Sequence, residues 1–80
     1  MLPATHFIDD RQWIASQIKQ IPMSLWESTA ESYTKVYTEA YAEKQNEGEL
    51  LQIQHARTTA NTRLRKYVQA VIEKTYHHNK

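Results

Sequence analysis

The chain has 80 residues, one glycine, two prolines, no cysteine and a net charge of +1. This length predicts a single domain over residues 1–80 with a small core. The lack of cysteine excludes disulfides and thiolate metal sites. No apolar run approaches the ~20 residues that cross a bilayer, and the N-terminus lacks the pattern of a secretory signal. We therefore expect a soluble, cytoplasmic protein.

The first predicted helix covers about residues 10–20 and follows a tail of residues 1–8. Asp9 or Asp10 can accept hydrogen bonds from the free amides of its first turn. Apolar residues at helical spacing form one stripe along it, namely Trp13, Ile14, Ile18 and Ile21. Pro22 is expected to end the helix.

The second predicted helix covers about residues 24–46. Ser24 and Glu27 match a capping box, in which each side chain bonds the backbone amide of the other residue. The sequence Asn-Glu-Gly at residues 46–48 then supplies residues that tolerate a left-handed turn.

The third predicted helix covers about residues 49–75, where an apolar stripe persists for more than twenty residues. Short connections make neighbouring helices antiparallel. The expected fold is therefore all-α: a three-helix bundle in which a short first helix packs on a long helical hairpin.

Tyr33, Tyr37 and Tyr41 are spaced four residues apart on the second predicted helix. Paired tyrosines can be nucleophiles that cut DNA, but the same spacing stacks residues along one packing face. Tyr33 and Tyr37 continue the stripe of Trp26 and Ala30, which favours packing. We expect no enzyme activity and no catalytic residue.

No cofactor or metal site is expected either. His6 and His55 are isolated, and the adjacent His77 and His78 would point about 100° apart on a helix. None of these histidines forms the i, i+4 pair typical of a helical metal site.

Charge is uneven along the chain. Residues 1–47 carry four Lys or Arg against seven Asp or Glu, whereas residues 48–80 carry six against two. A basic segment of this kind can face nucleic acid, or it can pack beside an acidic helix. The candidate residues for nucleic-acid binding are Arg57, Asn61, Arg63, Arg65 and Lys66.

Arg57 and Asn61 border the apolar stripe, so their polar groups need partners. Glu31, Glu39 and Glu43 of the acidic second helix are the candidate partners. Arg63 and Lys66 point away from Arg57 and Arg65 on the helix.

The segments around residues 7–41 and 58–68 resemble the helical N-terminal region of replication gene A proteins of temperate tailed phages. The matching features are Trp13, Ile21-Pro22, Tyr33 with Tyr37, and Ala60-Asn61-x-x-Leu64-Arg65. Those proteins nick DNA through paired tyrosines, but their catalytic region lies downstream of this helical part. The resemblance therefore implies a replication-associated module and carries no nicking activity over.

A first helix shorter than the hairpin leaves apolar residues uncovered at the hairpin tip. We expect Tyr37, Tyr41, Leu50, Leu51 and Ile53 to bind a protein partner or a second copy there, unless the N-terminal tail covers them. The sequence and this resemblance thus predict a non-enzymatic helical module of a phage or integrated element that acts in DNA replication by binding a protein or DNA. The alternative is a protein-interaction module or homodimer without a nucleic-acid role.

Overall fold

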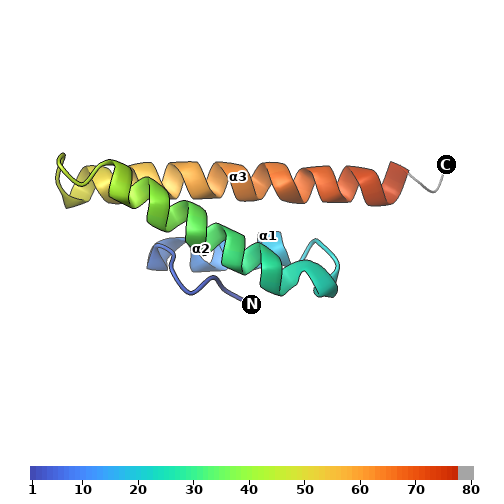
Figure 1. Ribbon diagram of the computed structural model, residues 1–80. Helices are drawn as coiled ribbons and strands as arrows, with labels where there is room; N and C mark the ends of the chain where they lie inside the picture. Colours follow the sequence, from blue (N-terminus) through green and yellow to red (C-terminus); the bar gives the residue numbers. More distant parts are fainter. Residues whose placement is uncertain (78–80) are drawn as a thin grey trace.

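The protein is an all-α three-helix bundle, as predicted. The computed structural model describes residues 1–77, with side chains described through Thr75. Its α-helices are α1 (Arg11–Ile18), α2 (Trp26–Glu43) and α3 (Glu49–His77), and the short 3-10 helices η1 (Ile8–Asp10) and η2 (Met23–Leu25) precede α1 and α2. Figure 1 shows that α2 and α3 form a hairpin, that α1 lies beside it, and that α3 extends past both at its C-terminal end.

The helix α1 is held by its predicted apolar stripe. Ile14, Ile18 and Ile21 are buried, and Trp13 is half-buried against them. At 1.5 Å per residue, α1 is about 12 Å long, α2 about 27 Å and α3 about 43 Å. The short α1 therefore covers only part of the hairpin.

The predicted capping box at the start of α2 is wrong. Ser24 lies inside η2, and α2 begins at Trp26 with Leu25 in the N-cap position and no side-chain cap bond. A Ser N-cap needs an extended backbone, whereas η2 holds residues 23–25 in a helical turn. The indole Nε1 of Trp26 instead donates to the carbonyl of Ile21 at 3.0 Å, which ties α2 to the end of α1.

The turn between α2 and α3 depends on Gly48. Gly48 has a φ of 92°, and no other described residue has a positive φ. A side chain would be strained in this conformation, so glycine is favoured. The prediction of a left-handed turn at residues 46–48 therefore holds at Gly48, and Asn46 does not adopt it.

One buried cluster joins the three helices. Tyr33, Tyr37 and Ala40 of α2 pack against a row of buried residues on α3 and against Ile14 and Ile18 of α1. The buried row on α3 consists of Ala56, Ala60, Leu64 and Val68. The small alanines let α2 approach α3 closely, and the two tyrosines fill the space beside α1.

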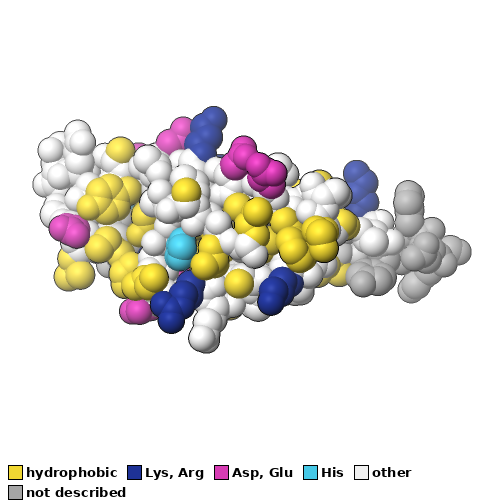
Figure 2. All heavy atoms as spheres, turned by 90° about the horizontal axis from the view of Figure 1, so that it is seen from below, with side chains coloured by type: hydrophobic (Ala, Val, Ile, Leu, Met, Phe, Trp, Pro, Cys, Tyr) yellow, Lys and Arg dark blue, Asp and Glu magenta, His cyan; other side chains and the backbone are white. Residues whose placement is uncertain are grey.

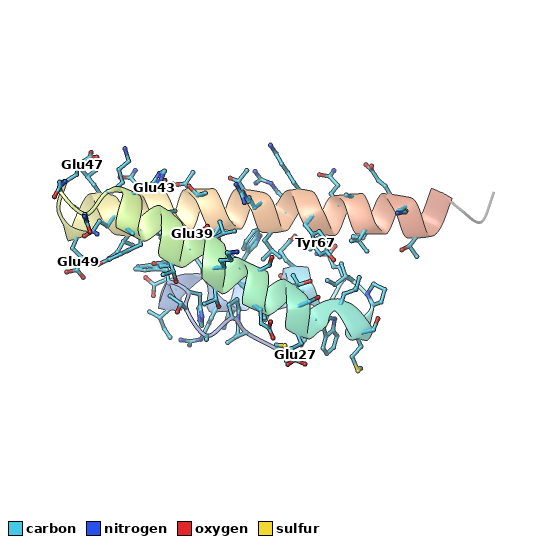
Figure 3. The ribbon with its side chains drawn as sticks, viewed as in Figure 1. Glu27, Glu39, Glu43, Glu47, Glu49 and Tyr67 are labelled. Carbon is cyan, nitrogen blue, oxygen red and sulfur yellow. The ribbon has the colours of Figure 1, made fainter. Side chains whose placement is uncertain are left out.

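The hairpin tip keeps an exposed apolar surface. Leu50 is 82% exposed and Leu51 is 46% exposed, while Tyr41 and Ile53 are half-buried. We call these four residues the tip patch. Seen from below, hydrophobic side chains lie near this end and in a second group further along the molecule (Figure 2). Figure 3 shows Glu43, Glu47 and Glu49 at the hairpin tip and Glu39 further along α2, and we call these four glutamates the acidic border of the tip.

The start of α2 provides a direct test of this local structure. Ser24→Ala should change the free energy of unfolding by less than about 0.5 kcal/mol, because the Ser24 side chain caps no helix. Trp26→Phe should cost about 1–2 kcal/mol, since it leaves the Ile21 carbonyl without its donor. Urea denaturation of both variants measures the difference. A larger loss in Ser24→Ala than in Trp26→Phe would contradict this description.

Candidate functional site

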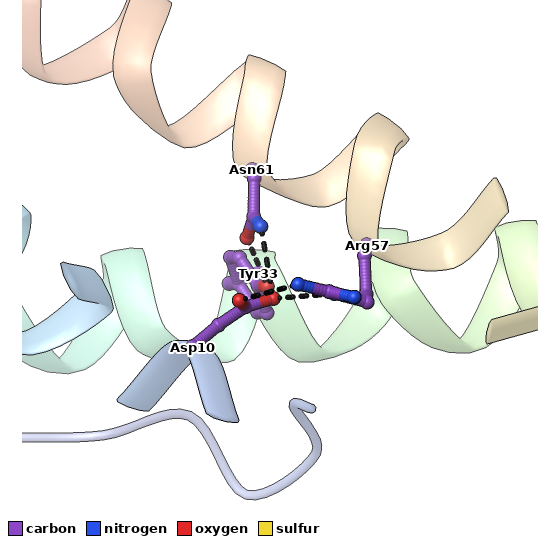
Figure 4. Close-up of polar contacts among 4 residues, drawn as sticks. All are labelled: Asp10, Tyr33, Arg57 and Asn61. Carbon is purple, nitrogen blue, oxygen red and sulfur yellow. Dashed lines mark hydrogen bonds and ion pairs between the residues drawn. The ribbon is translucent and has the colours of Figure 1, made fainter. Parts of the chain in front are cut away.

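A polar network joins all three helices at one point (Figure 4). Both carboxylate oxygens of Asp10 accept from Arg57, from Nε at 2.9 Å and from a terminal nitrogen at 2.9 Å. The amide nitrogen of Asn61 donates to Asp10 at 3.1 Å, and the hydroxyl of Tyr33 donates to the amide oxygen of Asn61. We call these four residues the Asp10 network.

The Asp10 network shows that two predictions from the sequence are wrong. Asp10 occupies the N-cap position of α1 but makes no side-chain cap bond, because its carboxylate is taken up by Arg57 and Asn61. The predicted partners for Arg57 and Asn61 on the acidic helix are wrong. Glu43 pairs with His55 at 2.8 Å instead. The partner of Arg57 and Asn61 is Asp10, which directly precedes α1 and lies 47 residues before Arg57 in the sequence.

Within the Asp10 network, the carboxylate of Asp10 is better shielded from solvent than the guanidinium of Arg57. The Asp10 side chain is 13% exposed and that of Arg57 is 40% exposed. The Arg57 guanidinium also lies 4.3 Å from the centre of the Phe7 ring, which covers one of its faces. Hydrogen bonds from Arg57 are the main cause that lowers the pKa of Asp10 below its ordinary value of 3.8. The same hydrogen bond raises the pKa of Arg57.

Tyr33 and Tyr37 occupy the core, as the packing interpretation predicts. Both rings are buried, and their centres lie 6.3 Å apart in a stacked arrangement. Burial is the main cause that raises the pKa of each phenol above its ordinary value. A raised pKa disfavours the phenolate that a nucleophile would need.

The cations of α3 divide into two faces. Arg57 and Asn61 point toward α1 and belong to the Asp10 network. Counting about 100° per residue, Arg65 lies about 200° from Arg63, so these two arginines face opposite sides. Arg63, Lys66 and Lys74 lie within about 80° of one another. All three are exposed, and none forms an ion pair with another described side chain.

Two residues of this second face were not singled out from the sequence. Tyr67 is 40% exposed and lies beside Arg63, at the edge of the buried row of α3 (Figure 3). Lys74 extends the face toward the C-terminus. The spacing of Arg63, Tyr67 and Lys74 at i, i+4 and i+11 is the sequence signal that identifies them. We call Arg63, Lys66, Tyr67 and Lys74 the basic face.

A groove of about 300 Å³ lies next to the basic face, between α2 and α3. Arg63 and Tyr67 line it from α3, and the hydroxyl-bearing Ser28, Thr29 and Ser32 line it from α2. Thr29 is buried, and its hydroxyl has no hydrogen-bond partner among the described residues. The basic face therefore borders a recess lined by apolar and hydroxyl-bearing side chains as well as open solvent.

The structure separates the residues predicted for a protein contact. Tyr37 is buried in the core, so it offers no surface to a partner. Leu50 and Leu51 are exposed, and the tail does not cover them. The tail packs elsewhere, with the Thr5 amide donating to the Thr34 hydroxyl at 3.3 Å and Pro3 buried.

No group of three or more metal-ligating side chains occurs among the described residues. The side chains of His77 and His78 lie outside the described part. No helix within residues 1–77 is long and apolar enough to cross a membrane.

No protein-family model, curated protein or solved structure matches the chain. The resemblance to phage gene A proteins therefore stays a prediction from the short motifs that carry it.

The Asp10 network predicts a defined pH dependence of stability. Asp10→Asn should lower the free energy of unfolding by about 2 kcal/mol at pH 7, because it weakens hydrogen bonds to a charged partner. The folded-state pKa of Asp10 is lowered, so its contribution is complete above the ordinary value of 3.8 and is lost as the pH falls below that value. Urea denaturation of the native chain and the variant between pH 7 and pH 3 measures the difference, which should shrink below pH 4.

Asp9→Asn is the matched control, because Asp9 is the exposed neighbour of Asp10. It should leave stability nearly unchanged at each pH. Equal losses in the two variants would mean that Arg57 and Asn61 do not depend on Asp10.

Proposed function

We propose that the protein is a non-enzymatic helical module that binds the nucleic-acid backbone through the basic face of α3. The observation that carries this proposal is that Arg63, Lys66 and Lys74 share one face of a projecting helix and form no ion pair with a described side chain. Cations without internal partners are available to phosphate groups, and the release of counterions from nucleic acid then favours binding.

The hydrogen bonds of the Asp10 network remove Arg57 and Asn61 from the candidate nucleic-acid interface. The side chains of Arg57 and Asn61 already donate hydrogen bonds to the Asp10 carboxylate, and giving up these bonds would weaken the attachment of α1. Arg65 lies on the other side of α3. Of the residues proposed from the sequence, Arg63 and Lys66 remain in the interface, and Tyr67 and Lys74 join them.

Tyr67 adds an aromatic surface to these charges. A half-exposed ring beside cations can stack on an unpaired base while the cations contact phosphates. Because phosphate contacts carry no sequence information, we expect binding that depends little on sequence. The setting we propose, DNA replication in a phage or integrated element, rests on the resemblance alone.

The exposed tip patch supports a second candidate function, a protein-interaction module without a nucleic-acid role. Leu50 and Leu51 are exposed side by side, and contiguous exposed apolar surface can mark a protein contact site. The tip patch lies at the turn between α2 and α3, whereas the basic face runs from the middle of α3 toward its C-terminus, so the two functions can be tested separately.

A salt titration tests the nucleic-acid proposal. Fluorescence anisotropy of labelled single-stranded and duplex DNA should show binding near 50 mM salt that weakens strongly by 200 mM, the range where counterion release dominates. The double variant Arg63→Ala/Lys66→Ala should bind more weakly, and its salt dependence should flatten by about one unit per lost phosphate contact.

The control is Arg11→Ala/Arg65→Ala, which removes the same charge from exposed arginines outside the basic face. It should retain most of the binding. No binding near 50 mM salt would eliminate the proposal. Equal losses in both double variants would mean that net charge, rather than the basic face, attracts DNA.

A further inference from the structure

The tip patch needs an occupant whose charge is opposite to its border. Residues 39–49 carry four Glu against one Lys, a net charge of −3. Glu43 pairs with His55 and Glu47 with Lys44, whereas Glu39 and Glu49 form no ion pair with another described side chain. The exposed Leu50 and Leu51 are therefore bordered by uncompensated negative charge.

A tip-to-tip dimer would bring two such borders together. Like charges placed opposite one another in an interface are repulsive and disfavour that pairing. The apolar surface at the tip is also small, so it supplies little free energy to overcome the repulsion. The occupant should instead be a cationic surface with apolar side chains of its own.

The other end of the same chain has this chemistry. Within residues 63–74, the three cations Arg63, Lys66 and Lys74 share the basic face, whereas Arg65 lies on the other side of α3. Tyr67 is 40% exposed, and Val71, one turn further along the same face of α3, is half-buried. We call residues 63–74 the basic segment of α3.

We propose that the tip patch of one copy binds the basic segment of α3 of a second copy, head to tail. Leu50 and Leu51 contact the Tyr67 ring and the apolar side chains beside it, and the glutamates of the border face the cations. Such an interface uses two different surfaces of each copy, so it leaves a free tip and a free basic segment at the ends of every assembly. Further copies can add to these ends.

The surfaces are small, so the association should be weak and visible only at high concentration. Sedimentation of the full chain from roughly 10 μM to 1 mM, a range that spans weak dissociation constants, measures it without nucleic acid. The weight-average mass should rise with concentration beyond that of two copies. Higher salt should reduce the rise, because it screens the charge pairs.

Two complementary variants identify the surfaces. The tip variant Leu50→Glu/Leu51→Glu keeps the basic segment. The basic-segment variant Lys66→Glu/Lys74→Glu keeps the tip patch. Each should sediment as a monomer alone, but an equimolar mixture should form a 1:1 complex that stops at two copies. All four positions are exposed, and circular dichroism checks that both variants stay helical.

The matched controls change exposed residues elsewhere. Leu2→Glu/Met23→Glu adds the same charge in place of exposed apolar residues, and Arg11→Glu/Lys19→Glu reverses the same charge on α1. Both should associate like the native chain. Three results would each overturn the head-to-tail proposal: a native chain that stays monomeric, a basic-segment variant that still dimerises alone, or a mixture of the two variants that does not form a complex.

Discussion

The ion pair between Asp10 and Arg57 is the interaction on which the arrangement of the helices most depends. The helix α1 has eight residues, too few to be stable alone in water. Ile14 and Ile18 pack against the hairpin and fix the distance between α1 and the hairpin. Asp10 fixes the orientation of α1 relative to the hairpin. Apolar packing is not directional, whereas a two-point bond from Arg57 has a defined geometry.

The same ion pair determines which charges of α3 remain free. Arg57 and Asn61 face α1 and are engaged, and Tyr33 extends the network into α2. The tyrosine that suggests DNA cleavage in the sequence is thus a donor in a structural network. The cations on the other face of α3 have no such partner within the described chain, and this difference separates Arg57 and Asn61 from the residues that we propose to bind nucleic acid.

The regular parts of the fold could be predicted because they depend on local patterns. Ile14, Ile18, Leu64 and Val68 lie at helical spacing, and each is buried as that spacing indicates. The partner of Arg57 could not be predicted, because Asp10 is 47 residues away and reaches it only after α1 has packed. The nearby glutamates of α2 are closer in sequence but lie on other faces of the bundle.

Two further errors have local causes. The capping box is a real pattern, but a 3-10 turn after Pro22 competes with it and places Ser24 in a helical backbone. The sequence pattern places Tyr67 in the apolar stripe, which predicts a core residue. The structure instead leaves Tyr67 40% exposed at the edge of the groove between α2 and α3.

We propose that the Asp10 network keeps Arg57 from binding DNA and leaves Arg63 available. Nuclear magnetic resonance can observe the Nε–H groups of Arg11, Arg57, Arg63 and Arg65 separately during a titration with a DNA oligonucleotide. We expect the Arg63 signal to shift with added DNA while the Arg57 signal stays at the position of the free protein. A shift of the Arg57 signal equal to that of Arg63, or a shift of Arg57 alone, would mean that the Asp10 network does not keep Arg57 from DNA.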